Sequence, residues 1–160
     1  LVEGDGSLQL NIQEMATLSA FNLPICLIIM NNQGYASIRT TQGNYFKGRY
    51  VGTGPEAGLK LPDLKKVAAT YQIPYIQILD ASELKQKLGE AMNLTWPIII
   101  DVSLASNEVL TPKVAAIPQP DGSMLSMPLE DMSPLLSIET MQKEMIVGLS
   151  EASLQAREQK

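Results

Sequence analysis

Residues 1–11, LVEGDGSLQLN, decide the fold because they have the form of a strand that turns directly into a helix. Two apolar residues precede Gly-Asp-Gly-Ser, and a helix-like pattern follows. The exposed backbone amides at such a helix start favour phosphate, which the carboxylate of Asp5 would repel. A divalent cation between them removes this conflict, since Mg2+ prefers hard oxygen ligands and is commonly shared by carboxylates and phosphates. The stretch therefore predicts a phosphate site bridged by a metal, with further ligands elsewhere in the chain.

Strand-like and helix-like segments alternate along the first two thirds of the chain. Apolar residues at helical spacing predict helices over residues 11–21, 64–71 and 84–92. Uninterrupted apolar runs predict strands over residues 24–32, 74–79 and 97–104. Asn11 and Glu14 have the spacing of a capping pair at the start of the first helix. This alternation predicts an α/β fold, a doubly wound and mostly parallel sheet with helices on both faces.

The sequence pattern changes after residue 103, where prolines are spaced too closely for long helices or strands. We expect an extended arm there, followed by one helix over residues 137–157 with an apolar stripe. The predicted organisation is an α/β domain over residues 1–110, with residues 111–160 as an arm and helix packed on that domain. The chain begins with Leu1, at what reads as the end of a strand, so we expect it to be cut from a longer protein.

Composition excludes several classes of function. The formal charge is -5, with 12 Lys and Arg against 17 Asp and Glu and no basic cluster, which counts against nucleic acid or an anionic membrane as partner. The longest apolar run, residues 25–30, is far shorter than the roughly 20 residues that span a bilayer. The single cysteine, Cys26, lies inside that run and is expected to be buried and unreactive. A cytoplasmic location fits these features.

Polar residues follow two predicted strands that a single helix joins. The first set is Gly-Asp-Gly-Ser at residues 4–7, and the second is Asn-Asn-Gln-Gly-Tyr at residues 31–35; Asp101 falls near a later strand end. In a parallel sheet the first two sets emerge side by side, which places Asp5 near Asn32. A carboxylate, a carboxamide oxygen and a carbonyl near Gly34 would then offer three hard oxygens to a cation. Taken alone, each set is better interpreted as an ordinary turn or loop, and only the two together favour a metal site.

Taken together, these residues carry a family resemblance. Gly-Asp-Gly and Asn-Asn are separated by 24 residues, which resembles the thiamine diphosphate motif. The segments EGDGSLQLNIQEMATL, MNNQGYASIR and PLEDMSPLL are similar to the carboxyl-terminal, cofactor-binding domain of the acetolactate synthase large-subunit family. The resemblance covers essentially the whole chain, and the paired motif is more specific than either half.

The resemblance implies roles for particular residues. The metal ligands would be the Asp5 carboxylate, the Asn32 side chain and the Gly34 carbonyl. Contacts to thiamine diphosphate would come from Gly4, Gly6, Ser7, Gly34, Tyr35 and Ile38. An apolar residue at Ile38 weakly favours carboligation, since some relatives that are simple decarboxylases have an acidic residue there. The glutamate that activates the cofactor is expected on a separate domain, and the chain has no His to serve as acid or base.

The expected function is therefore the diphosphate- and Mg2+-binding domain of an acetolactate synthase-like enzyme. Such an enzyme decarboxylates a 2-oxo acid such as pyruvate and transfers the acyl group to a second carbonyl. The expected assembly is a homodimer or homotetramer, and the fragment alone is expected to be inactive. Two alternatives stay open, a thiamine diphosphate-dependent lyase or decarboxylase of another pathway and a non-catalytic nucleotide-binding α/β module.

Two further sets of charged residues are better interpreted as structural or solvent-exposed than as functional. Arg39 could contact substrate or diphosphate, but a solvated or salt-bridged role is the better expectation. Glu130 and Asp131 are adjacent carboxylates in a segment bounded by prolines, and they are expected to cap a helix or face solvent rather than form an acid pair.

Overall fold

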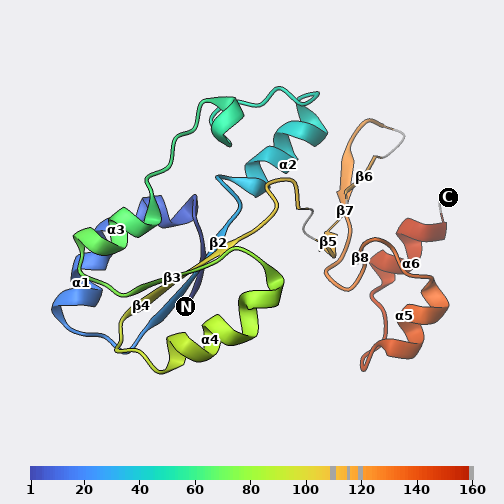
Figure 1. Cartoon of the computed structure of the whole chain (residues 1–160). Coiled ribbons are helices and arrows are strands. Elements are labelled where there is room, and N and C mark those ends of the chain that lie inside the picture. The colour runs from blue at the N-terminus through green and yellow to red at the C-terminus, as the bar shows by residue number, and fades with distance from the viewer. Residues whose placement is uncertain (109–110, 115, 119–120, 159–160) are drawn as a thin grey trace. The chain divides into compact units, whose positions relative to one another are not determined.

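The computed structural model describes residues 1–108, 111–114, 116–118 and 121–158 (Figure 1). The chain divides into two compact units, Leu1–Glu108 and Val109–Lys160. Each unit is described by itself, and the packing of the second on the first stays a prediction. Within the described ranges, no helix combines the length and the apolar character that crossing a membrane requires.

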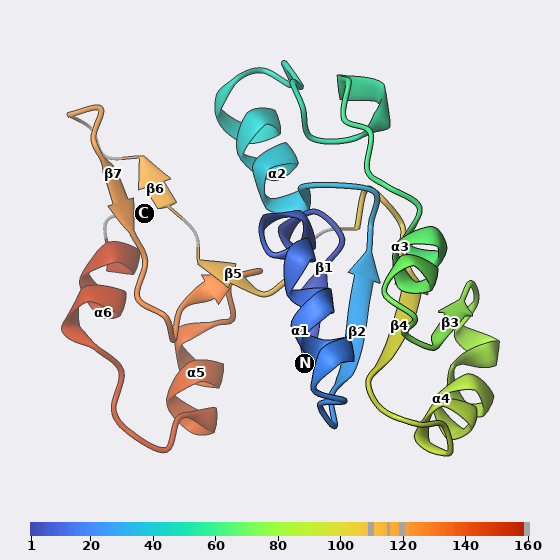
Figure 2. The ribbon, with the colours of Figure 1, turned by 90° about the vertical axis from the view of Figure 1, so that its left-hand side faces the viewer.

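The first unit is built on a parallel sheet of four strands. The strands are β1 (Val2–Gly4), β2 (Cys26–Asn31), β3 (Tyr75–Ile78) and β4 (Ile98–Ser103). Figure 2 shows them side by side in the order β1-β2-β4-β3. Gly4 pairs with Met30, so β1 and β2 end together and release their following loops at the same edge of the sheet. The predicted α/β class is confirmed.

Helices cover both faces of this sheet, as predicted. Figure 1 shows α1 (Met15–Ala20) and α3 (Leu64–Thr70) on one side and α4 (Leu84–Met92) on the other. The first face buries Leu8, Met15, Leu27, Ile29, Leu64, Ala68, Ile73 and Ile99. The second buries Ile78, Ala91, Ile98 and Ile100. Successive residues of a strand point to opposite faces, which is why residues 27–30 of β2 and residues 98–100 of β4 are apolar at every position.

The predicted bounds and caps of the helices are only partly correct. Asp63 caps α3 as its position suggests, since its Oδ1 accepts hydrogen bonds from the amides of Lys65 and Lys66 at 2.9 and 3.3 Å. The capping pair of Asn11 and Glu14 is wrong. Two 3-10 turns, Ser7–Leu10 and Ile12–Glu14, precede α1.

The reason lies in the backbone of the first turn. The Asn11 amide, which a capping box would need, already donates to the Leu8 carbonyl at 3.1 Å. The Glu14 carboxylate accepts instead from the Thr17 hydroxyl at 2.9 Å. At the end of α4, Met92 is 61% exposed, and Ala91 takes the buried position that the spacing assigns to Met92.

Helix α2 (Ala36–Tyr45) has no counterpart among the predicted elements. None of its residues is buried, so it lacks the apolar stripe that periodicity detects. The Thr40 and Thr41 hydroxyls bond back to carbonyls four residues earlier, at 3.0 and 3.1 Å.

The second unit contains short antiparallel strand pairs and two helices. Strand β5 (Lys113–Val114) pairs with β8 (Met132–Ser133), and β6 (Ala116–Pro118) pairs with β7 (Met124–Ser126). The single predicted helix is wrong, because α5 (Ile138–Glu144) and α6 (Glu151–Glu158) are separate. Met145 adopts an extended conformation that ends α5, and the Ser150 amide is bound outside the helix by Glu130.

Glu130 and Asp131 behave differently from each other. Glu130 Oε1 accepts from the Ser150 amide at 2.9 Å and from the Ser153 hydroxyl at 3.0 Å, so it caps the start of α6 as expected. Asp131 is 1% exposed and is bound by two nitrogens of the Arg157 guanidinium. A solvated role is therefore wrong for Asp131, whose carboxylate needs this cation to be buried.

The Glu130 cap predicts a dependence of stability on acid. Hydrogen bonds from Ser150 and Ser153 lower the pKa of Glu130 from 4.5 to about 2. A lowered folded pKa stabilises the unit above pH 4.5, and this contribution disappears as the pH falls toward 2. We expect Glu130→Gln to reduce the hydrogen-exchange protection of α6 at pH 6 and to match the wild type near pH 2. Glu139→Gln, at an exposed position of α5, is the control; equal protection of wild type and Glu130→Gln at pH 6 would contradict the cap.

Candidate functional site

The loops that follow β1 and β2 meet at Asp5. The Asp5 amide donates to the Met30 carbonyl at 3.4 Å, and its Oδ2 accepts from the Gly34 amide at 2.9 Å. Asp5 is only 3% exposed, although it lies in a turn between two glycines. The structure thus brings Asp5 together with the loop that carries Asn32, as the parallel sheet led us to expect.

The carboxylate of Asp5 is in an unusual environment. Burial raises its pKa, and backbone amides of Gly34, Gly6 and Asn32 work against this by stabilising the charged form. These donors hold the carboxylate in place, but among the described residues no Lys or Arg forms an ion pair with it. A buried carboxylate in this state is costly unless a positive group joins it.

Three buried side-chain oxygens of the described residues have no hydrogen-bond partner. They are Asp5 Oδ1, Asn32 Oδ1 and Thr53 Oγ1. An unsatisfied buried polar atom costs about 1–3 kcal/mol, so native proteins rarely keep one without a use. Two of the three are the atoms predicted to bind the metal.

The donor set fits a hard divalent cation. Among the described residues no three His, Cys, Asp or Glu side chains cluster as a metal site, so an all-carboxylate cage is excluded there. One carboxylate, one carboxamide and one carbonyl suit a Mg2+ site shared with phosphate oxygens, since this ion prefers oxygen ligands and retains water and substrate ligands.

Two glycines let the loops approach closely. Gly34 has φ +138, and a Cβ at this position would lie 2.4 Å from the Thr53 carbonyl oxygen. A Cβ on Gly6 would lie 2.8 Å from the Tyr35 ring and 2.9 Å from the Gly34 carbonyl oxygen. The predicted carbonyl ligand therefore lies against the Gly-Asp-Gly turn, and a side chain at either glycine would push it away.

The structure shows where Ser7, Tyr35 and Ile38 lie. Their contacts with the cofactor stay predictions. The Ser7 hydroxyl donates to the Glu3 carboxylate, which also accepts from the Gly4 amide at 3.2 Å. A hydroxyl has one proton, so Ser7 would have to leave Glu3 before it donated to a phosphate. Tyr35 is half-buried just before α2, and Ile38 on α2 is 46% exposed.

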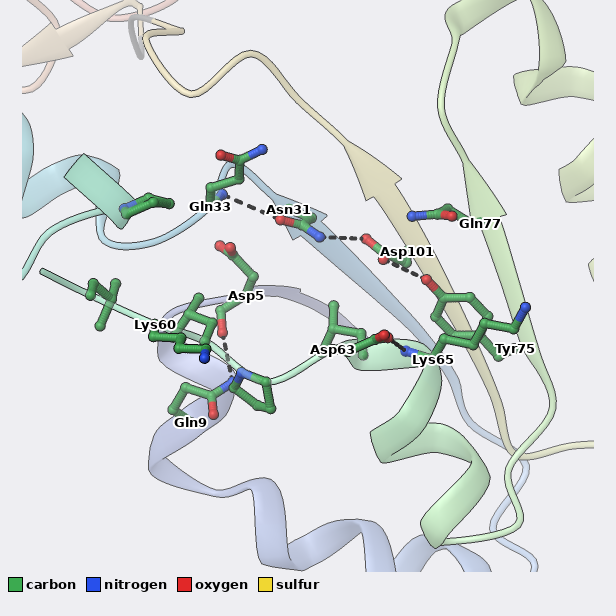
Figure 3. Close-up of a pocket in the computed structure, with 15 residues that line it drawn as sticks. Asp5, Gln9, Asn31, Gln33, Lys60, Asp63, Lys65, Tyr75, Gln77 and Asp101 are labelled. Atoms are coloured by element: carbon green, nitrogen blue, oxygen red, sulfur yellow. Dashed lines mark hydrogen bonds between the residues drawn. The ribbon is translucent and has the colours of Figure 1, made fainter.

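A pocket of about 480 Å³, lined by both polar and apolar side chains, adjoins Asp5 (Figure 3). It is lined by Asp5, Gln9, Asn31, Gln33, Pro55, Leu59, Lys60, Leu61, Pro62, Asp63, Leu64, Lys65, Tyr75, Gln77 and Asp101. Asp5 is the one predicted site residue in this lining. The candidate metal ligands therefore lie at the boundary of the pocket rather than inside it.

A chain of hydrogen bonds crosses the sheet beside this pocket and was not predicted. Figure 3 shows Tyr75, Asp101 and Asn31 joined in a row. The Tyr75 hydroxyl donates to Asp101 Oδ2 at 2.6 Å, Asn31 Nδ2 donates to Asp101 Oδ1 at 3.0 Å, and the Gln33 amide donates to Asn31 Oδ1 at 3.3 Å. Burial and the Asp101 carboxylate raise the pKa of Tyr75, so its hydroxyl stays a donor. This row of hydrogen bonds ends at Gln33, in the loop that carries Asn32.

Two expectations about single residues need correction. Asp101 lies inside β4 and is 2% exposed, whereas the sequence placed it at a strand end. Arg39 is only half-buried and forms no ion pair among the described residues; its guanidinium donates to backbone carbonyls instead. Sequence patterns gave no signal for Arg39, because its partners are main-chain atoms.

Comparison with known proteins agrees with this geometry. Residues 1–102 match the family model described as thiamine pyrophosphate enzyme, C-terminal TPP binding domain. The chain is 31% identical over 114 residues to the acetolactate synthase large subunit of Cyanidium caldarium, covering 71% of this chain and 19% of that protein. It is 32% identical over 112 residues to the same subunit of Haemophilus influenzae, covering 69% and 19%. The chain thus spans about a fifth of the length of these relatives.

Proposed function

The chain belongs to the thiamine pyrophosphate enzymes, and from this premise we propose that it binds the diphosphate end of thiamine diphosphate through Mg2+. The observation that carries the proposal is the pair of unpartnered buried oxygens, Asp5 Oδ1 and Asn32 Oδ1. They belong to loops joined by the hydrogen bond from the Gly34 amide to Asp5. A cation would satisfy both oxygens and compensate the buried charge of Asp5.

Each predicted residue has a defined part in this proposal. Asp5, Asn32 and the Gly34 carbonyl would occupy three of the six positions around Mg2+, leaving the others to phosphate oxygens and water. The turn residues Gly4, Gly6 and Ser7 would approach the diphosphate, and Tyr35 and Ile38 would pack beside the cofactor. Gly6 and Gly34 are needed as glycines because their missing side chains let the two loops touch.

The reaction of the complete protein is proposed from its relatives. Bound thiamine diphosphate supplies the electron sink that decarboxylation of a 2-oxo acid requires. This chain's residues would anchor and orient that cofactor, while the activating glutamate comes from another domain. We propose an acetolactate synthase-like enzyme that acts on a 2-oxo acid such as pyruvate and transfers the acyl group to a second carbonyl. A cytoplasmic homodimer or homotetramer completes the proposal.

Calorimetric titration of the complete protein with thiamine diphosphate tests the metal bridge. We expect binding with Mg2+ present and no measurable heat of binding in excess chelator, because the diphosphate would then face the Asp5 carboxylate directly. Binding that is unchanged by the chelator would contradict the bridge.

A second assay tests the reaction independently of the bridge. The complete protein, supplied with Mg2+ and thiamine diphosphate, is expected to release CO2 from pyruvate or another 2-oxo acid and to form an acyl-transfer product. Release of CO2 with only an aldehyde as product would favour the decarboxylase alternative. No turnover of any 2-oxo acid, despite cofactor binding, would contradict the proposed enzyme class.

A further inference from the structure

Arg39 joins three separate segments around the candidate metal site. Its Nη1 donates to the Thr53 carbonyl at 2.8 Å and to the Gln33 carbonyl at 3.4 Å. Its Nη2 donates to the Asn32 carbonyl at 2.9 Å and to the Ser106 carbonyl at 2.8 Å. One guanidinium on α2 therefore holds the loop after β2, the segment at Thr53 and the loop after β4.

The partners of Arg39 are all neutral. The ion pairs of the described residues are Lys87 with Glu83 and Arg157 with Asp131, so no carboxylate there balances Arg39. An arginine keeps its charge at any pH a protein survives, and its planar fork offers donors in fixed directions. Hydrogen bonds from a charged donor are stronger than neutral ones. The geometry is that of a clamp on the main chain.

The segment at Thr53 is packed tightly into this clamp. The Tyr35 amide donates to the Thr53 carbonyl at 3.0 Å, beside the bond from Arg39. A Cβ on Gly54 would lie 2.8 Å from Arg39 Nη1, so a side chain at this position would displace the guanidinium. The Thr53 carbonyl also lies against Gly34. Arg39 thus fixes both sides of the loop that contains Asn32 and Gly34.

We propose that Arg39 is a positioning residue that holds the Asn32 side-chain oxygen and the Gly34 carbonyl where a small divalent cation needs them. It acts by fixing the backbone of residues 32–34, without contact to the cation or the diphosphate. This inference rests on the proposed function. Mg2+ demands near-ideal octahedral geometry, whereas Ca2+ accepts flexible coordination, so loss of the clamp weakens Mg2+ more than Ca2+.

The test uses the complete protein and measures the concentrations of Mg2+ and of Ca2+ that give half-maximal binding of thiamine diphosphate. Arg39→Lys keeps the charge but not the planar fork, and Arg39→Met keeps only the apolar stem. Both are expected to raise the Mg2+ requirement by about 10–100-fold, the usual cost of losing an outer partner of a metal ligand. The Ca2+ requirement is expected to change less. Arg49→Lys and Arg49→Met, at an exposed position, are expected to change neither.

Gly54→Ala provides a second variant should the Arg39 variants fail to fold. It keeps the guanidinium but displaces Nη1, and the same shift in metal preference is expected at a smaller size. Lower thermal stability with an unchanged ratio of Mg2+ to Ca2+ requirement would overturn the positioning role. An Arg39→Lys variant whose Mg2+ requirement for binding equals that of the wild type would do the same. A wild-type protein that binds thiamine diphosphate without any divalent ion would instead overturn the proposed function, so the two failures are distinct.

Discussion

Asp5→Asn is expected to abolish Mg2+-dependent binding of thiamine diphosphate while raising the stability of the metal-free protein. Binding should weaken by more than about 100-fold, since even an outer partner of a metal ligand contributes about 10–100-fold. Stability should rise because the variant removes a buried charge, whereas the asparagine oxygen can still accept from the Gly34 amide. The gain at pH 7 should be about 1 kcal/mol, at the lower end of the cost of an unsatisfied buried polar group.

Thermal unfolding of the complete protein in excess chelator, and again with Mg2+ and thiamine diphosphate, measures both effects. The wild type should be stabilised by the ligands, and Asp5→Asn should not respond to them. Asp63→Asn is a matched control, because Asp63 is exposed and asparagine caps a helix about as well as aspartate. A metal-free Asp5→Asn protein less stable than the wild type would contradict the view that Asp5 is kept for ligand binding at a cost in stability.

Gly34→Ala is expected to be the most damaging single substitution in the site. Gly34 has φ +138, where L residues are strained, and the new Cβ would lie 2.4 Å from the Thr53 carbonyl oxygen. Strain and overpacking each cost about 1–3 kcal/mol, so a loss of about 3 kcal/mol or more is expected in urea unfolding. Cofactor binding should be lost as well, because relief of the clash moves the Gly34 carbonyl and the neighbouring Asn32.

Comparison of Gly34→Ala with Gly58→Ala separates the cost of backbone strain from the cost of a steric clash. Gly58 also has a positive φ, +83, but a Cβ there meets no atom within 4 Å. The left-handed conformation alone should cost about 1–2 kcal/mol, and cofactor binding should not change. Equal losses of stability at Gly34 and Gly58 would show that the contact with Thr53 contributes nothing.

The sheet of the first unit could be predicted because its determinants are local. Strands buried on both faces are predominantly apolar, and Asp63 marks the start of α3 as a polar cap. Helix α2 could not be predicted, because it buries no residue and therefore has no apolar period. The separation of α5 from α6 was missed for a related reason. Met145 adopts an extended conformation that ends α5, and a hydrogen bond from Ser150 to Glu130, 20 residues away, caps the start of α6.

The candidate site shows the same division between local and tertiary signals. The proximity of Asp5 to the loop with Asn32 follows from two short motifs and the rule that parallel strands end at one edge. The clamp of Arg39 leaves no pattern, since it binds backbone carbonyls that every residue possesses. Tyr75 was not singled out, and Asp101 was placed at a strand end rather than within β4, because both lie among the apolar residues of strands. Groups of this kind are recognised only when the chain has folded.

The central claim is that Asp5 and Asn32 share one divalent cation with the diphosphate. Crystals of the complete protein grown with thiamine diphosphate and Mn2+, which accepts the same oxygen ligands as Mg2+, test it through the anomalous scattering of manganese. We predict one strong peak at bonding distance from Asp5 Oδ1, Asn32 Oδ1 and the Gly34 carbonyl oxygen. A well-occupied cofactor with its metal bound away from Asp5 and Asn32, or with no metal at all, would contradict the account.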